Sequence, residues 1–144
     1  MRKLCAAAAV AALCSLPRPT IGAEAAWTPG MWVDEDVIEL RTTDPGAGPH
    51  WSKVWVAVVD DQLYVRLGKR AASRIERNTT APYVDVRIAG QEFDHVRTEP
   101  APEMAERVAA EMHEKYWSDA LVHLFPHPLT LRLLAPEPTS DGAS

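Results

Sequence analysis

The chain has very little cysteine. It holds two among its 144 residues, Cys5 and Cys14, and both lie near the N-terminus. Once residues 1–25 are set apart, as argued below, no cysteine remains. The rest of the chain therefore has no disulfide framework, thiolate nucleophile, Fe–S cluster or cysteine-based zinc site. Such a chain depends on its hydrophobic core, and about 119 residues are enough to supply one.

The chain also lacks a surplus of positive charge, an internal repeat and a long apolar run after residue 25. Its formal charge is −5, or −7 without residues 1–25, and this acidity argues against nucleic-acid binding, which depends on neutralising phosphates. The longest apolar run of that part covers only 54–59, so we expect no membrane contact once the signal is cleaved. No Walker loop, GxGxxG motif or Ser/His/Asp arrangement indicates a hydrolase or a nucleotide triphosphatase.

The first 25 residues have the pattern of an export signal. Two basic residues precede an apolar run over 4–16, and Ala23 and Ala25 offer the small side chains that a signal peptidase needs. The run is shorter than the roughly 20 apolar residues that span a bilayer. We therefore predict a signal peptide at 1–25 and a periplasmic or secreted protein. An uncleaved anchor or a misassigned start codon is the alternative.

The remaining chain divides into three parts. A lead-in at 26–36 carries Trp27 and Trp32, which we expect to pack on the domain that follows. That domain covers 37–135, and the polar tail at 136–144 is expected to be disordered.

Within the domain, runs of apolar and alternating residues predict six short strands. They lie at 37–42, 53–59, 63–67, 83–89, 92–98 and 129–134. The turn residues Asp60 and Asp61, and Gly90 with Gln91, favour antiparallel hairpins. His95 is expected on a strand face with Phe93 and Arg97, where it is an acid–base candidate.

Two helices are predicted. A short one covers 71–78, after the third strand. A longer one starts at Pro102, and its apolar residues recur every four positions: Met104, Val108, Met112 and Tyr116. Hairpin strands with one main late helix indicate an α+β protein, and closing six antiparallel strands into a barrel hides their edges.

Positive charge is concentrated in one segment, 66–77. Five of the 12 cationic residues after residue 25 lie there: Arg66, Lys69, Arg70, Arg74 and Arg77. A strand delivers Arg66, Gly68 permits close backbone approach, and Ser73 is expected near a helix start. This pattern predicts a site for a phosphate or a carboxylate. A solvated basic helix face, paired with Glu92, Asp94 or Glu99, is the alternative.

Four sequence stretches occur in a recognisable order. They are VWVAVVDDQLYVRLGKRAASRIERN, YVDVRIAGQEFDHV, a helix ending in EKYW, and LTLRLL. Over residues 36–135 this set resembles the flavin-binding split-barrel superfamily, which includes pyridoxamine-phosphate-oxidase-like and deazaflavin-dependent nitroreductase-like proteins. Within it the chain is similar to a DUF2255-type family. The resemblance implies a six-stranded antiparallel split β-barrel.

The resemblance also implies a cofactor, FMN or a deazaflavin. In that superfamily, side chains of the third strand and the next helix start hold the cofactor phosphate. The matching positions here are Arg66, Lys69, Ser73 and Arg77. The preceding strand lines the flavin or deazaflavin ring, which implies Lys53 and Trp55 as ring contacts. A homodimer with the cofactor between its subunits is likewise implied.

Two functions remain open. One is a flavin- or deazaflavin-dependent oxidoreductase whose cofactor performs the hydride chemistry, in keeping with the lack of an evident catalytic residue. The other is a non-catalytic module that holds a small anionic ligand, or a partner's acidic surface, with the same basic segment. We predict no metal site, because Pro126 and Pro128 flank His127 and make a helical pair with His123 unfavourable.

Overall fold

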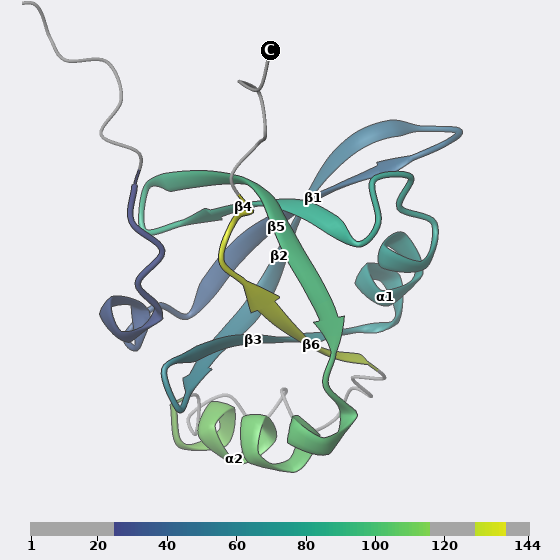
Figure 1. Ribbon diagram of the computed structural model, residues 1–144. Coiled ribbons are helices and arrows are strands. Elements are labelled where there is room, and N and C mark those ends of the chain that lie inside the picture. The colour runs from purple at the N-terminus through teal and green to yellow at the C-terminus, as the bar shows by residue number, and fades with distance from the viewer. Residues whose placement is uncertain (1–24, 116–128, 138–144) are drawn as a thin grey trace, which may run out of the picture.

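Six antiparallel strands form a closed barrel in the computed structural model, which describes residues 25–115 and 129–137 (Figure 1). Their order around the barrel is β1-β2-β3-β6-β5-β4. The bounds are β1 Val37–Asp44, β2 Gly48–Val59, β3 Gln62–Leu67, β4 Tyr83–Ile88, β5 Gln91–Pro100 and β6 Leu129–Leu134. The expected α+β class and the six-stranded antiparallel split barrel are confirmed.

The strands alternate between a buried interior and an outer side, because successive side chains of a strand point to opposite faces. In β3, Leu63, Val65 and Leu67 lie in the main core, and Val54 and Val56 of β2 join them. Tyr64, between two of these, belongs to a second apolar cluster. The outer side of β2 and β3 is therefore partly apolar as well.

Short segments cover the barrel on two opposite sides (Figure 1). Helix α1 (Lys69–Glu76) packs its small and apolar side chains against the main core on one side. On the other side lies the single-turn helix η1 (Pro29–Trp32). Trp32 is 3% exposed, and its ring meets those of Trp27 and Phe93 edge-on at centroid distances of 5.1 and 5.5 Å. The lead-in tryptophans pack on the domain, as expected.

Helix α2 (Ala105–Lys115) lies outside the barrel along β2 and β3 and follows the short helix η2 (Pro102–Met104). Its buried residues Val108 and Met112 pack against Ala57 and Tyr64. The expected late helix is thus confirmed up to Lys115. Its fourth expected contact, Tyr116, lies outside the described residues, as do most of the predicted signal peptide and most of the predicted tail.

Two hairpin turns use the left-handed backbone region. Asp60 and Asp61 have φ of 49° and 59°, as expected for a tight turn between β2 and β3. The turn between β4 and β5 is one residue earlier than expected: Ala89 and Gly90 hold φ of 49° and 75°. Its centre is therefore Ala89-Gly90 rather than Gly90-Gln91.

Strand β5 contains a bulge opposite β4. The register shifts between Val84 and Val86, so Phe93 and Val96 are both buried while His95 is exposed at a φ of 55°. The expectation that His95 shares a face with Phe93 is wrong, because the extra residue of a bulge reverses the alternation. Among the described residues, no helix is long and apolar enough to cross a membrane.

Candidate functional site

Arg66 leaves β3 on the outer side of the barrel, because its neighbours Val65 and Leu67 fill the interior. Its direct partners across the sheet are Trp55 of β2 and Thr130 of β6. We call Trp55, Arg66 and Thr130 the Arg66 row. Directly opposed residues have Cβ atoms about 5 Å apart, so an indole, a guanidinium and a hydroxyl lie next to one another across three strands.

The guanidinium of Arg66 has no acidic partner in the part of the chain that the structure describes. The residue is half-buried, and its Nε is shielded from solvent without donating a hydrogen bond. Burial lowers the pKa of Arg66 below its ordinary value, and no neighbouring carboxylate raises it again. An arginine still keeps its charge at neutral pH. A shielded cation without a counterion is costly, and a bound anion would offset that cost.

Thr130 is a site residue that sequence reasoning missed. It is 6% exposed, and within the described ranges its hydroxyl makes no hydrogen bond, although its carbonyl accepts the N–H of Ala101 at 2.9 Å. The alternation in LTLRLL already places Thr130 and Arg132 on one face. The pairing of β6 with β3 could not be predicted, because the two strands are far apart in sequence.

The start of α1 adds two exposed cations, Lys69 and Arg70. The N-cap is Gly68, so no side chain caps the helix, and the first turn holds no acidic residue. The first N–H groups and both cations are therefore available to an anion. Gly68 directly follows β3, so this helix start lies close in the chain to Arg66, which β3 carries.

Ser73 and Arg77 lie further along α1. The helix begins two residues earlier than expected, so the expectation that Ser73 lies near its start is wrong: Ser73 is in the second turn. Arg77 is the C-cap, about 12 Å beyond Lys69 at the helical rise. Its Nε lies 3.3 Å from the carboxylate of Asp44. Arg77 is therefore separate from the Arg66 row and already has an acidic partner.

Two of the three acids proposed as alternative partners of the basic segment, Glu92 and Glu99, lie near other cations. Glu92 contacts Arg87 at 2.8 Å, and Glu99 lies 3.9 Å from Arg97. Neither neutralises Arg66 or the start of α1. For these two acids the alternative is wrong.

Lys53 lies two residues before Trp55 on the same outer side and lines a groove of about 450 Å³ between β1 and the β4–β5 turn. Charges alternate across the groove. Lys53 lies opposite Glu39, Glu39 lies opposite Arg87, and Arg87 contacts Glu92. The groove therefore has no surplus of charge, in contrast to the Arg66 row.

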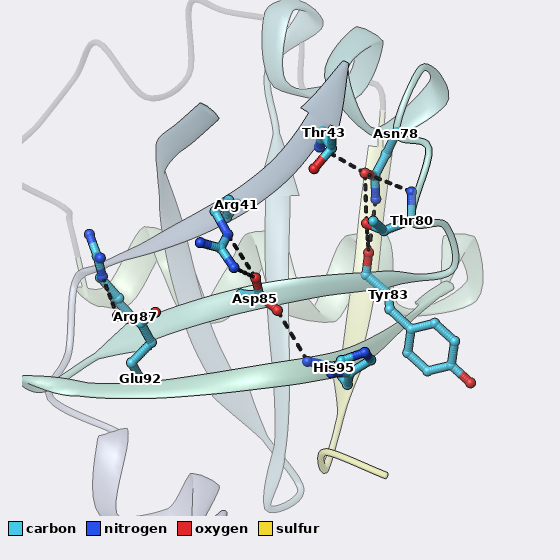
Figure 2. A network of polar contacts seen from close by, with 9 residues as sticks. All are labelled: Arg41, Thr43, Asn78, Thr80, Tyr83, Asp85, Arg87, Glu92 and His95. Atoms are coloured by element: carbon cyan, nitrogen blue, oxygen red, sulfur yellow. Dashed lines mark hydrogen bonds and ion pairs between the residues drawn. The ribbon is translucent and has the colours of Figure 1, made fainter. Parts of the chain in front are cut away.

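A polar network covers the outer side of β1, β4 and β5 (Figure 2). Arg41 donates two hydrogen bonds to Asp85, whose other oxygen accepts the backbone N–H of His95 at 3.2 Å. Both carboxylate oxygens of Asp85 thus accept hydrogen bonds from Arg41 and from the backbone of His95, and neither bonds the imidazole of His95. The network fixes strands and gives no second group for acid–base chemistry at His95.

A second part of the same network surrounds Asn78 (Figure 2). Its amide accepts the N–H of Thr43 at 2.9 Å and the hydroxyl of Thr80, and donates to the carbonyl of Tyr83. These bonds tie the chain after α1 to β1 and β4. Buried Asn78 is therefore satisfied within the protein and is a scaffold residue.

No group of three or more acidic, histidine or cysteine side chains suited to a metal ion occurs among residues 25–115 and 129–137. His123 and His127, the pair weighed as metal ligands, lie outside those ranges. His113 is exposed on α2.

No family model and no curated protein sequence matches the chain. Similarity to a DUF2255-type family therefore stays a prediction.

Solved structures share the fold. One is HutZ, the heme storage protein from Vibrio cholerae, with a TM-score of 0.54 at 17% identity over 75% of this chain and 87% of that one. A second is the F420-H2 dependent reductase FDR-A, with a TM-score of 0.52 at 11% identity over 69% of this chain and 94% of that one. A third, a domain-swapped dimer, has a TM-score of 0.52 at 11% identity over 69% of this chain and 81% of that one. At such identities the likeness shows the split-barrel fold alone.

Proposed function

We propose that this chain binds a phosphate-bearing flavin or deazaflavin on the outer side of its barrel and acts as an oxidoreductase outside the cytoplasm. One observation carries the proposal: the shielded guanidinium of Arg66, which has no acidic partner among the described residues, lies directly opposite the indole of Trp55. A cofactor of this class joins an anionic group to a planar ring system. The two neighbouring side chains match these two parts.

Each residue of the site has a role that follows from its chemistry. Arg66, with Lys69, Arg70 and the open start of α1, would hold the phosphate. Trp55 and Lys53 would line the ring. The bound cofactor would supply hydride transfer, and the protein would orient it and exclude water. No step of this proposal requires a catalytic acid or base from the chain.

A structural neighbour supports the redox assignment. FDR-A, which has the same barrel, is a reductase dependent on F420-H2. Because a shared fold does not carry function by itself, the assignment depends on the Arg66 row and on the experiment below. Ser73 and Arg77, implied as phosphate ligands by the resemblance, are the weaker part of the proposed set, since Arg77 already pairs with Asp44.

A second candidate is a non-catalytic module that stores or carries a small anionic ligand in the same site. The neighbour HutZ, a heme storage protein, shows that this fold serves storage as well. Binding without turnover of any electron donor and acceptor would favour this candidate over the oxidoreductase.

Assembly and export belong to the same proposal. We propose a homodimer, supported by the domain-swapped neighbour and by exposed apolar side chains at Met31, Val33 and Val37. Export is supported by the signal pattern at 1–25.

An absorbance titration tests the cofactor. Protein beginning at Ala26 is titrated with FMN and with an F420-type deazaflavin at micromolar concentration, and natively purified protein is analysed by mass spectrometry. We expect a perturbed visible band and a rise in melting temperature with one of the two. No spectral change, no thermal shift and no co-purified cofactor would refute the proposed function.

A further inference from the structure

Two polar side chains on neighbouring strands lack partners at the same place. Buried polar groups in proteins are normally hydrogen-bonded, as Asn78 shows here. In the described residues, Arg66 makes no hydrogen bond through its shielded Nε. The hydroxyl of Thr130, on a residue only 6% exposed, makes no hydrogen bond to the described protein either, and its oxygen stays open to solvent, so a ligand can reach it. The two residues are directly opposed in the register of β3 and β6.

The side chains of Arg66 and Thr130 point to the same side of the sheet. Leu131 and Leu133 of β6 fill the interior, so Thr130 faces the outer side, as Arg66 does. A hydroxyl donates one hydrogen bond, and a guanidinium donates several in a fixed plane. Side by side on two strands, they form a fork of donors for which the described part of the chain supplies no acceptor.

We propose that Thr130 and Arg66 together form an oxyanion site that recognises a phosphate monoester group. A carboxylate offers only two oxygens, whereas a phosphate monoester offers three terminal oxygens and up to two charges. It can therefore accept from Arg66 and Thr130 and still face the cations Lys69 and Arg70 at the start of α1. The inference rests on the proposed function and assigns recognition to a strand hydroxyl in place of that of Ser73.

The test compares ligands with and without phosphate. FMN, inorganic phosphate and riboflavin, which lacks the phosphate, are titrated against wild type, Thr130→Val and Thr130→Ser. Val keeps the shape of Thr and removes the hydroxyl, and Ser keeps the hydroxyl. The matched control is Thr42→Val, at another strand threonine that is 5% exposed but faces α1 across a small cavity.

We expect Thr130→Val to weaken FMN and inorganic phosphate binding about tenfold, the effect of one hydrogen bond to a charged group. Thr130→Ser should stay within about threefold of wild type, and Thr42→Val should be unchanged. Riboflavin binding should not respond to any of these changes. Because a general loss of structure would weaken both flavins equally, the selective loss of FMN identifies a phosphate contact.

Other outcomes overturn the inference in distinguishable ways. If Thr130→Val binds FMN and phosphate as wild type does while Arg66→Ala loses both, Thr130 is not a ligand and the proposed function stands. Equal loss of FMN and riboflavin in Thr130→Val would mean a structural role. If wild type binds neither FMN, a deazaflavin nor phosphate, the proposed function and this inference both fail.

Discussion

At the scale of single residues, Arg66 differs from most arginines of the described chain. Six others have a carboxylate within 4 Å: Arg41, Arg77, Arg87, Arg97, Arg107 and Arg132. Arg66 has none there, and its Nε is shielded. Removing it therefore strands no buried acid, which is the usual reason why loss of a buried ion-pair partner is destabilising.

Arg66→Ala should separate binding from stability. We expect FMN affinity to fall about ten- to a hundredfold, because a charge-assisted hydrogen bond is lost. The melting temperature of the ligand-free protein should stay constant or rise, because an uncompensated cation is removed. Calorimetric melts with and without FMN measure both effects. Arg132→Ala, whose guanidinium bonds the buried Tyr64, is the contrasting control and should lower the melting temperature. A large melting loss in Arg66→Ala without ligand would contradict the site assignment.

The residues of the site were only partly predictable. The sequence indicates Arg66 by charge density and strand alternation, and Lys53 and Trp55 by resemblance. It could not indicate Thr130, because its significance depends on the pairing of β3 with β6. The expected position of Ser73 near the helix start was wrong, because α1 begins at Lys69, directly after its N-cap Gly68, and not at residue 71.

At the scale of elements, the turns contribute to stability through their backbone angles. Ala89 holds a φ of 49° in the β4–β5 turn, followed by Gly90 at 75°. This pair of left-handed residues favours Asn-Gly, because a Cβ in that region is strained unless the residue is Asn, Asp or Gly. The sequence here is Ala-Gly, so the first position carries avoidable strain.

Ala89→Asn should therefore raise the free energy of unfolding by about 0.5–1 kcal/mol. Urea denaturation with an unchanged slope measures it. Ala110→Asn, at an exposed position of α2, is the matched control and should cost about 0.5 kcal/mol through helix propensity. A loss of stability at both positions would contradict the turn geometry.

Asp44 holds the turn between β1 and β2 and responds to pH. Its Oδ1 accepts the N–H groups of Gly46 and Ala47, and its Oδ2 lies near Arg77. The hydrogen bond from Gly46, followed by the charge of Arg77, lowers the pKa of Asp44 below its ordinary value of 3.8.

Because the folded pKa is the lower one, the stabilisation by Asp44 is complete above pH 3.8 and is lost as the pH falls through the folded value. Asp44→Ala should therefore lower the melting temperature at pH 7, and the difference from wild type should shrink below pH 3.8. Asp94→Ala, at an exposed position of β5, controls for the change in net charge. A constant difference at all pH values would show that the carboxylate charge is irrelevant.

The helices and strands themselves were largely predictable from the sequence. Of their arrangement, only the fold class, an antiparallel α+β barrel, was predictable. Alternation and, for the strand at 53–59, a continuous apolar run predicted all six strands, since each buries at least one face, and β6 matches its expected bounds of 129–134. The bulge at His95 was missed, although Phe93 and Val96 are three residues apart instead of two, because the extra residue is identified only by the register with the partner strand. The order β3-β6-β5 was equally hidden, since these pairings join distant segments.

At the scale of the molecule, the lead-in is part of the folded barrel. Ala25 and Trp27 pack against the main core, and Trp32 is buried within it. Helix α2 is fastened to the same region, because Lys115 donates a hydrogen bond to the carbonyl of Glu35. The lead-in therefore contributes packing that the strands alone do not supply.

This packing limits where an export signal can be cut. Cleavage after Ala25 removes one small, partly buried side chain, whereas cleavage beyond Trp27 would remove part of the aromatic cluster. We expect mass spectrometry of exported protein to find Ala26, or a residue next to it, at the N-terminus. An intact Met1 on exported material would contradict this.

A chain of residues 26–144 should melt cooperatively. In that chain, Trp32→Ala should lower the free energy of unfolding by about 3–5 kcal/mol, the usual effect of removing a buried tryptophan. If Trp32→Ala melted like its parent, the lead-in would be dispensable, and the position of the cut would no longer be restricted by the fold.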